Sequence, residues 1–207
     1  MKRHSLSLLL SAVLALPLAA QANVIPGNWS LLSSSGTYGS LRAGSIWAPP
    51  PPLASQFSMI DGSFRPEGTQ WNDGSWWWDQ DPSVNGTYAE PMGVRIDFSS
   101  AQTIDRFVVQ ADDNDSYQVD YWDGSAWQGI YNTGFAGGGG LRTRDSGILG
   151  AISTTKLRVY ATAGDNYYAL SEIQAFAPSS QVPEPNAALL VALGLGLAAW
   201  AGRRKPR

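Results

Sequence analysis

The chain has 207 residues, with 17 acidic and 14 basic side chains and a formal net charge of −3. It contains no cysteine, and its single histidine, His4, lies near the N-terminus. Beyond residue 4 the chain therefore has no side chains for Ser–His or Cys–His nucleophiles, or for zinc bound by histidine or cysteine.

The N-terminus has the pattern of a secretory signal peptide. Two basic residues precede the apolar stretch 6–19, and Ala20 and Ala22 occupy the two small-residue positions that a signal peptidase reads. We therefore expect residues 1–22 to be removed during export, His4 with them.

The exported part has a different charge from the whole chain. Residues 23–185 contain all 17 acidic side chains and 8 of the basic ones, a formal charge of −9. Such a surface repels nucleic acid and anionic lipid, so neither is an expected partner. It accommodates neutral ligands and divalent cations.

The middle of the chain has the pattern of an all-β protein. Residues 23–54 form a Ser-, Gly- and Pro-rich N-terminal segment, in which 48–52 predicts a polyproline turn. After it, no long amphipathic helix is evident before the C-terminal tail. β-rich runs separated by turn residues predict an antiparallel β-sandwich; they are 92–98, 104–110, 117–122 and 156–161.

Three groups of short motifs resemble those of a discoidin-like (F5/8 type C, galactose-binding-like) β-sandwich. They are Ile60-Asp61-Gly62 with Gly68-Thr69-Gln70-Trp71, Arg95-Ile96-Asp97-Phe98 with Thr103-Ile104-Asp105, and Leu170-Ser171-Glu172-Ile173-Gln174. The resemblance covers residues 55–177. Two departures affect the loops: Asp97-Phe98-Ser99 replaces the usual Asp-Leu-Gly, and an insertion surrounds the tryptophans at 76–78.

The same resemblance implies a structural calcium ion. In discoidin-like modules calcium binds between an early Asp-Gly turn and a glutamate near the last strand, positions that match Asp61 and Glu172. The alternative is an ordinary surface aspartate and a glutamate at a strand edge.

The stretch 112–115 is a weaker calcium candidate. Asp112, Asp113 and Asp115 could donate oxygens to calcium, but their spacing does not match an EF-hand. We favour a solvated turn between two strands.

Clustered aromatic residues are candidates for stacking on sugar rings. They are Trp76, Trp77 and Trp78, together with Tyr167 and Tyr168. In an extended segment Trp76 and Trp78 point to one face and Trp77 to the other, so packing in the core is the competing interpretation. For Trp71 we favour the core.

No residue pattern marks a catalytic site. Seventeen carboxylates make chance pairs plentiful, and nothing singles out a pair for glycoside hydrolysis. A Ser–Lys nucleophile would need Lys156, the only lysine between residues 23 and 185, within a strand-like run where a solvated ammonium is expected.

The C-terminal tail has three parts. A linker at 178–186 is followed by the uncharged apolar stretch 187–202 and the basic cluster 203–207. The apolar stretch is just short of the usual length of a membrane-spanning helix, and the basic cluster predicts a cytoplasmic end.

This tail resembles the PEP-CTERM sorting signal of Gram-negative bacteria. The sequence that carries the resemblance is Val182, Pro183, Glu184 and Pro185, followed by the apolar stretch and the arginines. The resemblance implies transient anchoring in the inner membrane, processing by an exosortase-type transpeptidase, and release to the cell surface or extracellular matrix of an organism that makes exopolysaccharide.

Together these features predict a non-catalytic module that binds extracellular polysaccharide through loops at one end of the sandwich. The alternative is a structural matrix protein that associates with copies of itself. A glycosidase or lyase is the third candidate.

Overall fold

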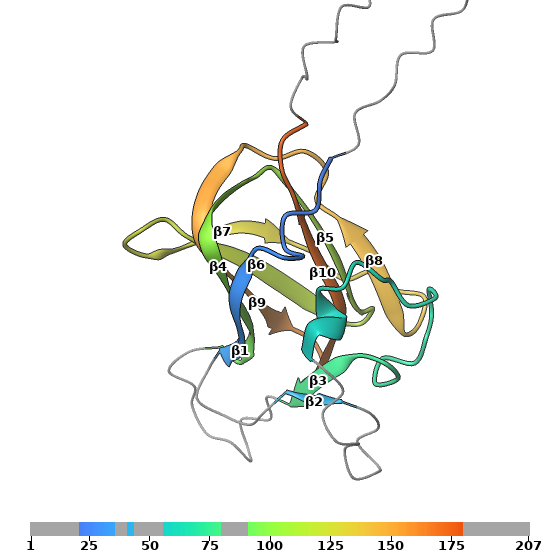
Figure 1. Cartoon of the computed structure of the whole chain (residues 1–207). Coiled ribbons are helices and arrows are strands. Elements are labelled where there is room, and N and C mark those ends of the chain that lie inside the picture. Colours follow the sequence, from blue (N-terminus) through green and yellow to red (C-terminus); the bar gives the residue numbers. More distant parts are fainter. Residues whose placement is uncertain (1–20, 36–40, 44–55, 80–90, 180–207) are drawn as a thin grey trace, which may run out of the picture. The chain divides into compact units, whose positions relative to one another are not determined.

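Two antiparallel five-stranded sheets pack against each other in the computed structural model (Figure 1). It describes residues 21–35, 41–43, 56–79 and 91–179, all of which belong to one compact unit, Gln21–Ser179. The first sheet has the order β1 (Trp29–Ser35), β4 (Gly93–Ile104), β9 (Ile152–Ala163), β6 (Ser116–Trp122) and β7 (Trp127–Asn132). The second has the order β2 (Arg42–Ala43), β3 (Trp76–Asp79), β10 (Tyr167–Phe176), β5 (Arg106–Asp112) and β8 (Leu141–Asp145).

The core lies between the sheets and follows from alternation along the strands. In β4, Val94, Ile96 and Phe98 are buried, whereas Arg95 and Asp97 on the opposite face are partly exposed. A strand with one apolar face is stable only when that face is covered. The second sheet provides the cover.

The predicted antiparallel β-sandwich is confirmed. The four predicted runs correspond to β4, β5, β6 and β9; β5 is shifted by two residues from its run, and the other three strands are longer than theirs. β1 and β2 lie within residues 23–54, which we expected to form a segment separate from the sandwich. β1 pairs with β4 along its length, so the sandwich includes part of that segment.

The outer face of the second sheet is covered by the segment 56–75, which begins with the short 3-10 helix η1 (Gln56–Met59) and is called the strap below. Gln110 of β5, fully buried, accepts a hydrogen bond from the Arg65 amide (2.7 Å) and donates to the Arg65 carbonyl (2.8 Å). The Ser171 hydroxyl also donates to Gln110 Oε1 at 2.7 Å. The polar side chains of this sheet face are buried because they pair with the strap.

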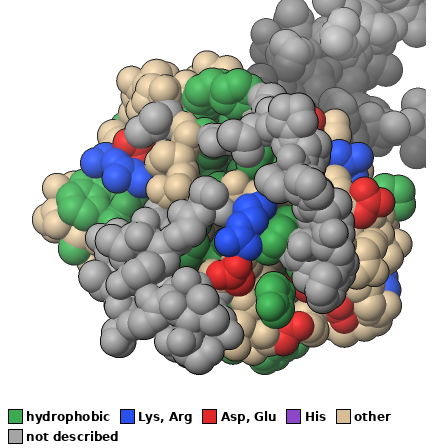
Figure 2. Space-filling model, turned by 90° about the horizontal axis from the view of Figure 1, so that it is seen from below, with side chains coloured by type: hydrophobic (Ala, Val, Ile, Leu, Met, Phe, Trp, Pro, Cys, Tyr) green, Lys and Arg blue, Asp and Glu red, His purple; other side chains and the backbone are tan. Residues whose placement is uncertain are grey.

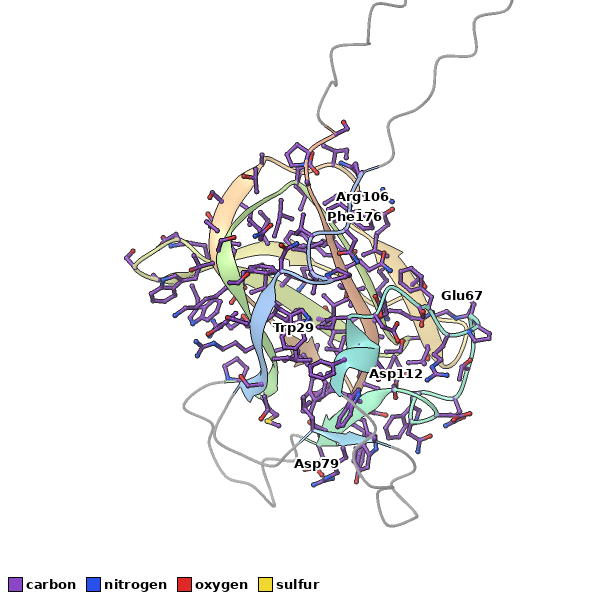
Figure 3. The ribbon with its side chains drawn as sticks, viewed as in Figure 1. Trp29, Glu67, Asp79, Arg106, Asp112 and Phe176 are labelled. Carbon is purple, nitrogen blue, oxygen red and sulfur yellow. The ribbon has the colours of Figure 1, made fainter. Side chains whose placement is uncertain are left out.

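The two ends of this unit lie side by side. The Ala177 amide donates to the Ala22 carbonyl at 3.0 Å, and Asn23 pairs with Phe176, the last residue of β10. The connections after β5 and before β10 lie at the other end of these strands, because β5 and β10 are antiparallel. Figure 3 accordingly shows Arg106 and Phe176 far from Asp112 and Asp79.

Several predicted segments fall outside the described residues. They are most of the signal peptide, the polyproline turn at 48–52, and the tail with its sorting sequence and apolar stretch. In the part of the chain that the structure describes, no helix has the length and apolar character needed to cross a membrane.

Candidate functional site

The three consecutive tryptophans of β3 are buried, with 1–4% of each residue exposed. Trp76 and Trp78 belong to the main core between the sheets, whereas Trp77 joins a separate cluster with Leu141 and Ala169 on the outer face of the second sheet. The predicted alternation of the side chains is therefore present. Neither face leaves an indole open to solvent.

The strap covers Trp77 with a fourth indole. Trp71 meets Trp77 edge to face, with ring centroids 5.8 Å apart, and lies 6.2 Å from the ring of Tyr167. Tyr167 is 43% exposed, but its neighbour Tyr168 is buried against Trp78 in the core. Of the predicted stacking residues, only Tyr167 presents a substantially exposed ring.

Hydrogen bonds bring three connections together at this end of the sandwich. The Asp113 carbonyl, in the β5–β6 turn, accepts from the amide of Ala136 (3.0 Å), and its carboxylate accepts from Gly139 (2.9 Å). In the same turn, Asn114 donates to Asp165, in the β9–β10 turn, at 3.0 Å. Turns distant in the sequence thus form one surface.

This surface carries exposed aromatic and polar side chains, which we call the loop-end cluster. Phe135, beside Ala136, is 63% exposed, and the amide of Tyr167 donates to the Asp165 carboxylate at 2.9 Å. The members of the loop-end cluster are Trp71, Asp113, Asn114, Phe135, Asp165 and Tyr167. The aromatic rings offer apolar faces, and the carboxylates and amide offer hydrogen-bonding groups.

Two other aspartates of the 112–115 stretch are buried beneath the loop-end cluster. Asp115 accepts a hydrogen bond from the Tyr117 hydroxyl (3.0 Å), which itself accepts from the Ala169 amide (2.9 Å). Burial, with the neighbouring charge of Asp112, raises the pKa of Asp115 to about 8, and burial raises that of Asp112 to about 7. Arg144 donates to the main-chain oxygens of both aspartates. The two buried carboxyls therefore accept hydrogen bonds within the turn and stabilise it.

The structure places the turn that contains Asp61 of the predicted calcium site against Glu172. The amide of Gly62, next to Asp61, donates to Glu172 Oε1 at 2.9 Å across the boundary between strap and β10. Glu172 is fully buried, its Oε2 has no hydrogen-bond partner within the described residues, and burial raises its pKa to about 7. An unpaired buried carboxylate oxygen beside a second carboxylate is the kind of donor set that a cation compensates.

Further protein ligands for such a cation are not evident among side chains. Within residues 21–35, 41–43, 56–79 and 91–179, no group of three or more His, Cys, Asp or Glu side chains could hold a metal ion. Calcium takes six to eight oxygens, so Asp61 and Glu172 would need main-chain carbonyls or water to complete its shell.

Sequence reasoning missed three of the six members of the loop-end cluster: Trp71, Phe135 and Asp165. Phe135 is the one aromatic residue in a glycine-rich stretch, which was a usable signal, because such loops seldom bury a large side chain. Asp165 and Asn114 come together only through the tertiary fold. Trp71 was expected in the core and is half-buried, because it is part of the strap that covers β3.

Solved structures similar to the chain include carbohydrate-binding modules and a larger protein of which the chain covers about a quarter. The chain resembles "SpGH29" (17% identity, TM-score 0.42), covering 75% of this chain and 28% of that one. It resembles the CBM32-1 and CBM32-2 domains of Clostridium perfringens ZmpB with 13% identity and a TM-score of 0.47, covering 73% of this chain and 35% of that one. It resembles chitosan-binding module 1 of a Paenibacillus sp. IK-5 chitosanase/glucanase with 19% identity and a TM-score of 0.41, covering 75% of this chain and 99% of that one. The chain thus spans about a third of the first two proteins. At these identities and TM-scores, the similarity assigns no ligand to this chain.

The tail matches a family model directly. Residues 181–205 match the PEP-CTERM protein-sorting motif, which confirms the sorting signal predicted from Val182, Pro183, Glu184 and Pro185. No curated protein matches the chain.

Proposed function

We propose that this protein is an exported, non-catalytic module that binds polysaccharide through the loop-end cluster. The observation that carries the proposal is the exposure of Tyr167 beside Asp165 and Asn114, together with the exposure of Phe135, whose neighbour Ala136 contacts the same turn. Sugar rings present apolar C–H faces and peripheral hydroxyls. Aromatic rings with adjacent amide and carboxylate groups are complementary to both.

The position of the cluster supports this function. The chain leaves the sandwich at Ser179 on its way to the sorting motif, and the loop-end cluster lies at the opposite end of β10. β10 has ten residues and spans about 30 Å, at about 3.3 Å per residue. A ligand could therefore reach the cluster while the C-terminal tail is engaged elsewhere.

We further propose that the sorting motif directs processing by an exosortase-type enzyme. The sequence supports transient attachment to the inner membrane of a Gram-negative cell through residues 187–202, followed by transfer to the cell surface or matrix. Exopolysaccharide is the polymer that the protein would meet there.

A structural calcium ion is part of the proposal. Asp61 and the unpaired Oε2 of Glu172 would hold it and tie the strap to β10. Calcium would neutralise the buried carboxylate and has no catalytic step assigned to it.

The first experiment is a calorimetric titration of the protein with exopolysaccharide purified from the producing cells. We expect saturable heat, about tenfold weaker binding in a Tyr167→Ala/Phe135→Ala variant, and little change in Ile148→Ala, an equally exposed apolar residue outside the cluster. Equal affinity in all three proteins would exclude the loop-end cluster as the binding site. Absence of any heat would favour the self-associating matrix protein, and release of sugar products would favour the glycosidase or lyase.

A further inference from the structure

The outer face of the first sheet carries a second group of aromatic side chains, which the loop-end cluster does not include. Trp122 and Trp127 face each other across the β6–β7 hairpin, with ring centroids 5.5 Å apart at 71°. Lys156 lies 5.3 Å from the ring of Trp122, and the guanidinium of Arg158 lies 4.7 Å from Trp127 and 5.1 Å from Tyr160. We call these residues, with Asp120, the sheet-face platform.

Strand pairing arranges the sheet-face platform in rows across the sheet. Arg158 of β9 lies opposite Asp120 of β6, which in turn lies opposite Gly129 of β7. Two strand spacings separate β7 from β9, about 10 Å. Side chains in such rows form a continuous surface across three strands, in contrast to the turns of the loop-end cluster.

The charges of this face compensate one another. Arg158 Nη2 lies 2.8 Å from Asp120 Oδ2, and the guanidinium of Arg95 meets the carboxylate of Asp97 with both contacts at 2.8 Å. Among the basic side chains of this face, Lys156 alone makes no ion pair with a described residue. An almost neutral face on a segment of charge −9 discriminates against polyanions, which the rest of the surface repels.

A glycine leaves part of the outer face of the β6–β7 hairpin without a covering side chain. A Cβ atom on Gly129 would lie 3.1 Å from Gln118 Nε2 and 3.5 Å from Asp120 Oδ1, and Gly129 itself is exposed. Gln118 is partly exposed, whereas Asp120 is buried and pairs with Arg158. The partly exposed rings of Trp122 and Trp127 belong to the same hairpin, so this face offers apolar rings and an amide group to a sugar chain.

We propose that the sheet-face platform is a second carbohydrate-binding site, which takes a neutral polysaccharide chain laid across β7, β6 and β9. It is separate from the loop-end cluster: β6 begins at the Asp112–Asp115 turn and places Trp122 about 20 Å away, at its other end. The platform as a binding site goes beyond the proposed function and does not depend on it. Only its consequence, that one molecule with two sites can cross-link two polymer chains, rests on the proposed function.

The test isolates the platform by using Tyr167→Ala/Phe135→Ala as the parent, in full-length protein produced and exported by its own cells. The probe is exopolysaccharide from those cells, used as purified and after chemical reduction of its carboxyl groups. We expect the parent to retain saturable binding, with the same affinity for both preparations. Failure of the loop-end proposal leaves this expectation unchanged, because the loop-end side chains are already removed.

Two further changes examine the surface itself. Trp127→Ala should weaken binding about tenfold and Trp127→Phe, which keeps a ring, much less. Gly129→Val leaves every ring in place, puts a side chain over Gln118 and Asp120, and should weaken binding by a similar factor. Trp127→Ala also removes the contact with Arg158 and can fail to fold for that reason. Gly129→Val then serves as the test, and its melting temperature shows that its fold is intact.

Three results would overturn the proposal. They are a parent that binds neither preparation, binding that requires the carboxyl groups of the polymer, and an unchanged affinity in a folded Gly129→Val protein. If binding requires the carboxyl groups, the aromatic rings serve only to pack against Arg158 and Lys156, and the polymer is recognised by charge at another place.

Discussion

At the scale of single residues, adjacent aromatic side chains serve different surfaces. Tyr167 is exposed beside Trp71, whereas Tyr168 packs on Trp78 in the core. Because side chains alternate across a strand, a consecutive pair or triplet cannot form one platform. Aromatic residues that share a face come instead from different strands or turns, such as Trp122 and Trp127.

The raised pKa of Asp115 predicts how the stability of the folded protein depends on pH. The pKa of this buried carboxyl is about 8 in the folded protein against an ordinary 3.8. Between these values the folded protein holds a proton that the unfolded chain releases, so stability falls as pH rises. Asp112, Asp113, Asp165, Tyr117 and Arg144 surround the group.

We expect the melting temperature to fall between pH 5 and pH 9, and to fall less in an Asp115→Asn variant, whose amide oxygen can still accept from Tyr117. His4 lies outside the sandwich, so no histidine of the sandwich contributes to this range. Asp113→Asn, at a partly exposed position in the same turn, is the control. Parallel pH curves for wild type and Asp115→Asn would show that Asp115 is already ionised in the fold.

At the scale of elements, the strap turns a two-layer sandwich into one with a polar third layer. Its main-chain groups pair with Gln110 and Glu172, and its Glu67 carboxylate accepts from the Thr143 amide of β8 at 3.1 Å. Figure 3 shows Glu67 on the same side of the view as β8. The sequence indicated extended strands in the second sheet, but no local pattern indicated that the strap covers their outer face.

Calcium should stabilise this element if Asp61 and Glu172 hold it. We expect millimolar calcium to raise the melting temperature relative to EDTA and to slow hydrogen exchange in residues 61–68. A Glu172→Gln variant should lose this response but keep its fold, because the amide can still accept from Gly62. Asp73→Asn, an exposed strap position, serves as the control. An unchanged melting temperature in calcium and EDTA would remove the ion from the proposal.

At the scale of the whole molecule, the sorting motif and the sandwich have different tasks. Residues 181–205 match a sorting signal, and the compact unit ends at Ser179. The surface seen in Figure 2 intersperses hydrophobic, basic and acidic side chains, without a broad patch of one charge. We therefore propose that recognition depends on local groups such as the loop-end cluster and not on a broad charged patch.

Replacing Pro183, Glu184 and Pro185 by alanine should block processing of the tail without altering the sandwich. We expect mass spectrometry of the protein from the producing cells to find residues 187–207 still attached in this variant and absent from wild type. Ser180→Ala, just outside the matched motif, should be processed normally, and the melting temperature should be the same in all three. Removal of the tail from the alanine variant would contradict the proposed processing.

The sequence by itself determined the sandwich and the sorting signal, because both depend on local order: alternation in runs such as 92–98, and the succession of Pro-Glu-Pro, apolar stretch and arginines. It also paired Asp61 with Glu172 through the resemblance; the fold places Gly62, next to Asp61, against Glu172, and the calcium site itself stays a prediction. Only the tertiary structure decided which aromatic rings stay in contact with solvent. Exposure depends on what packs over a strand, and β3 is covered by its partner sheet on one side and by the strap on the other.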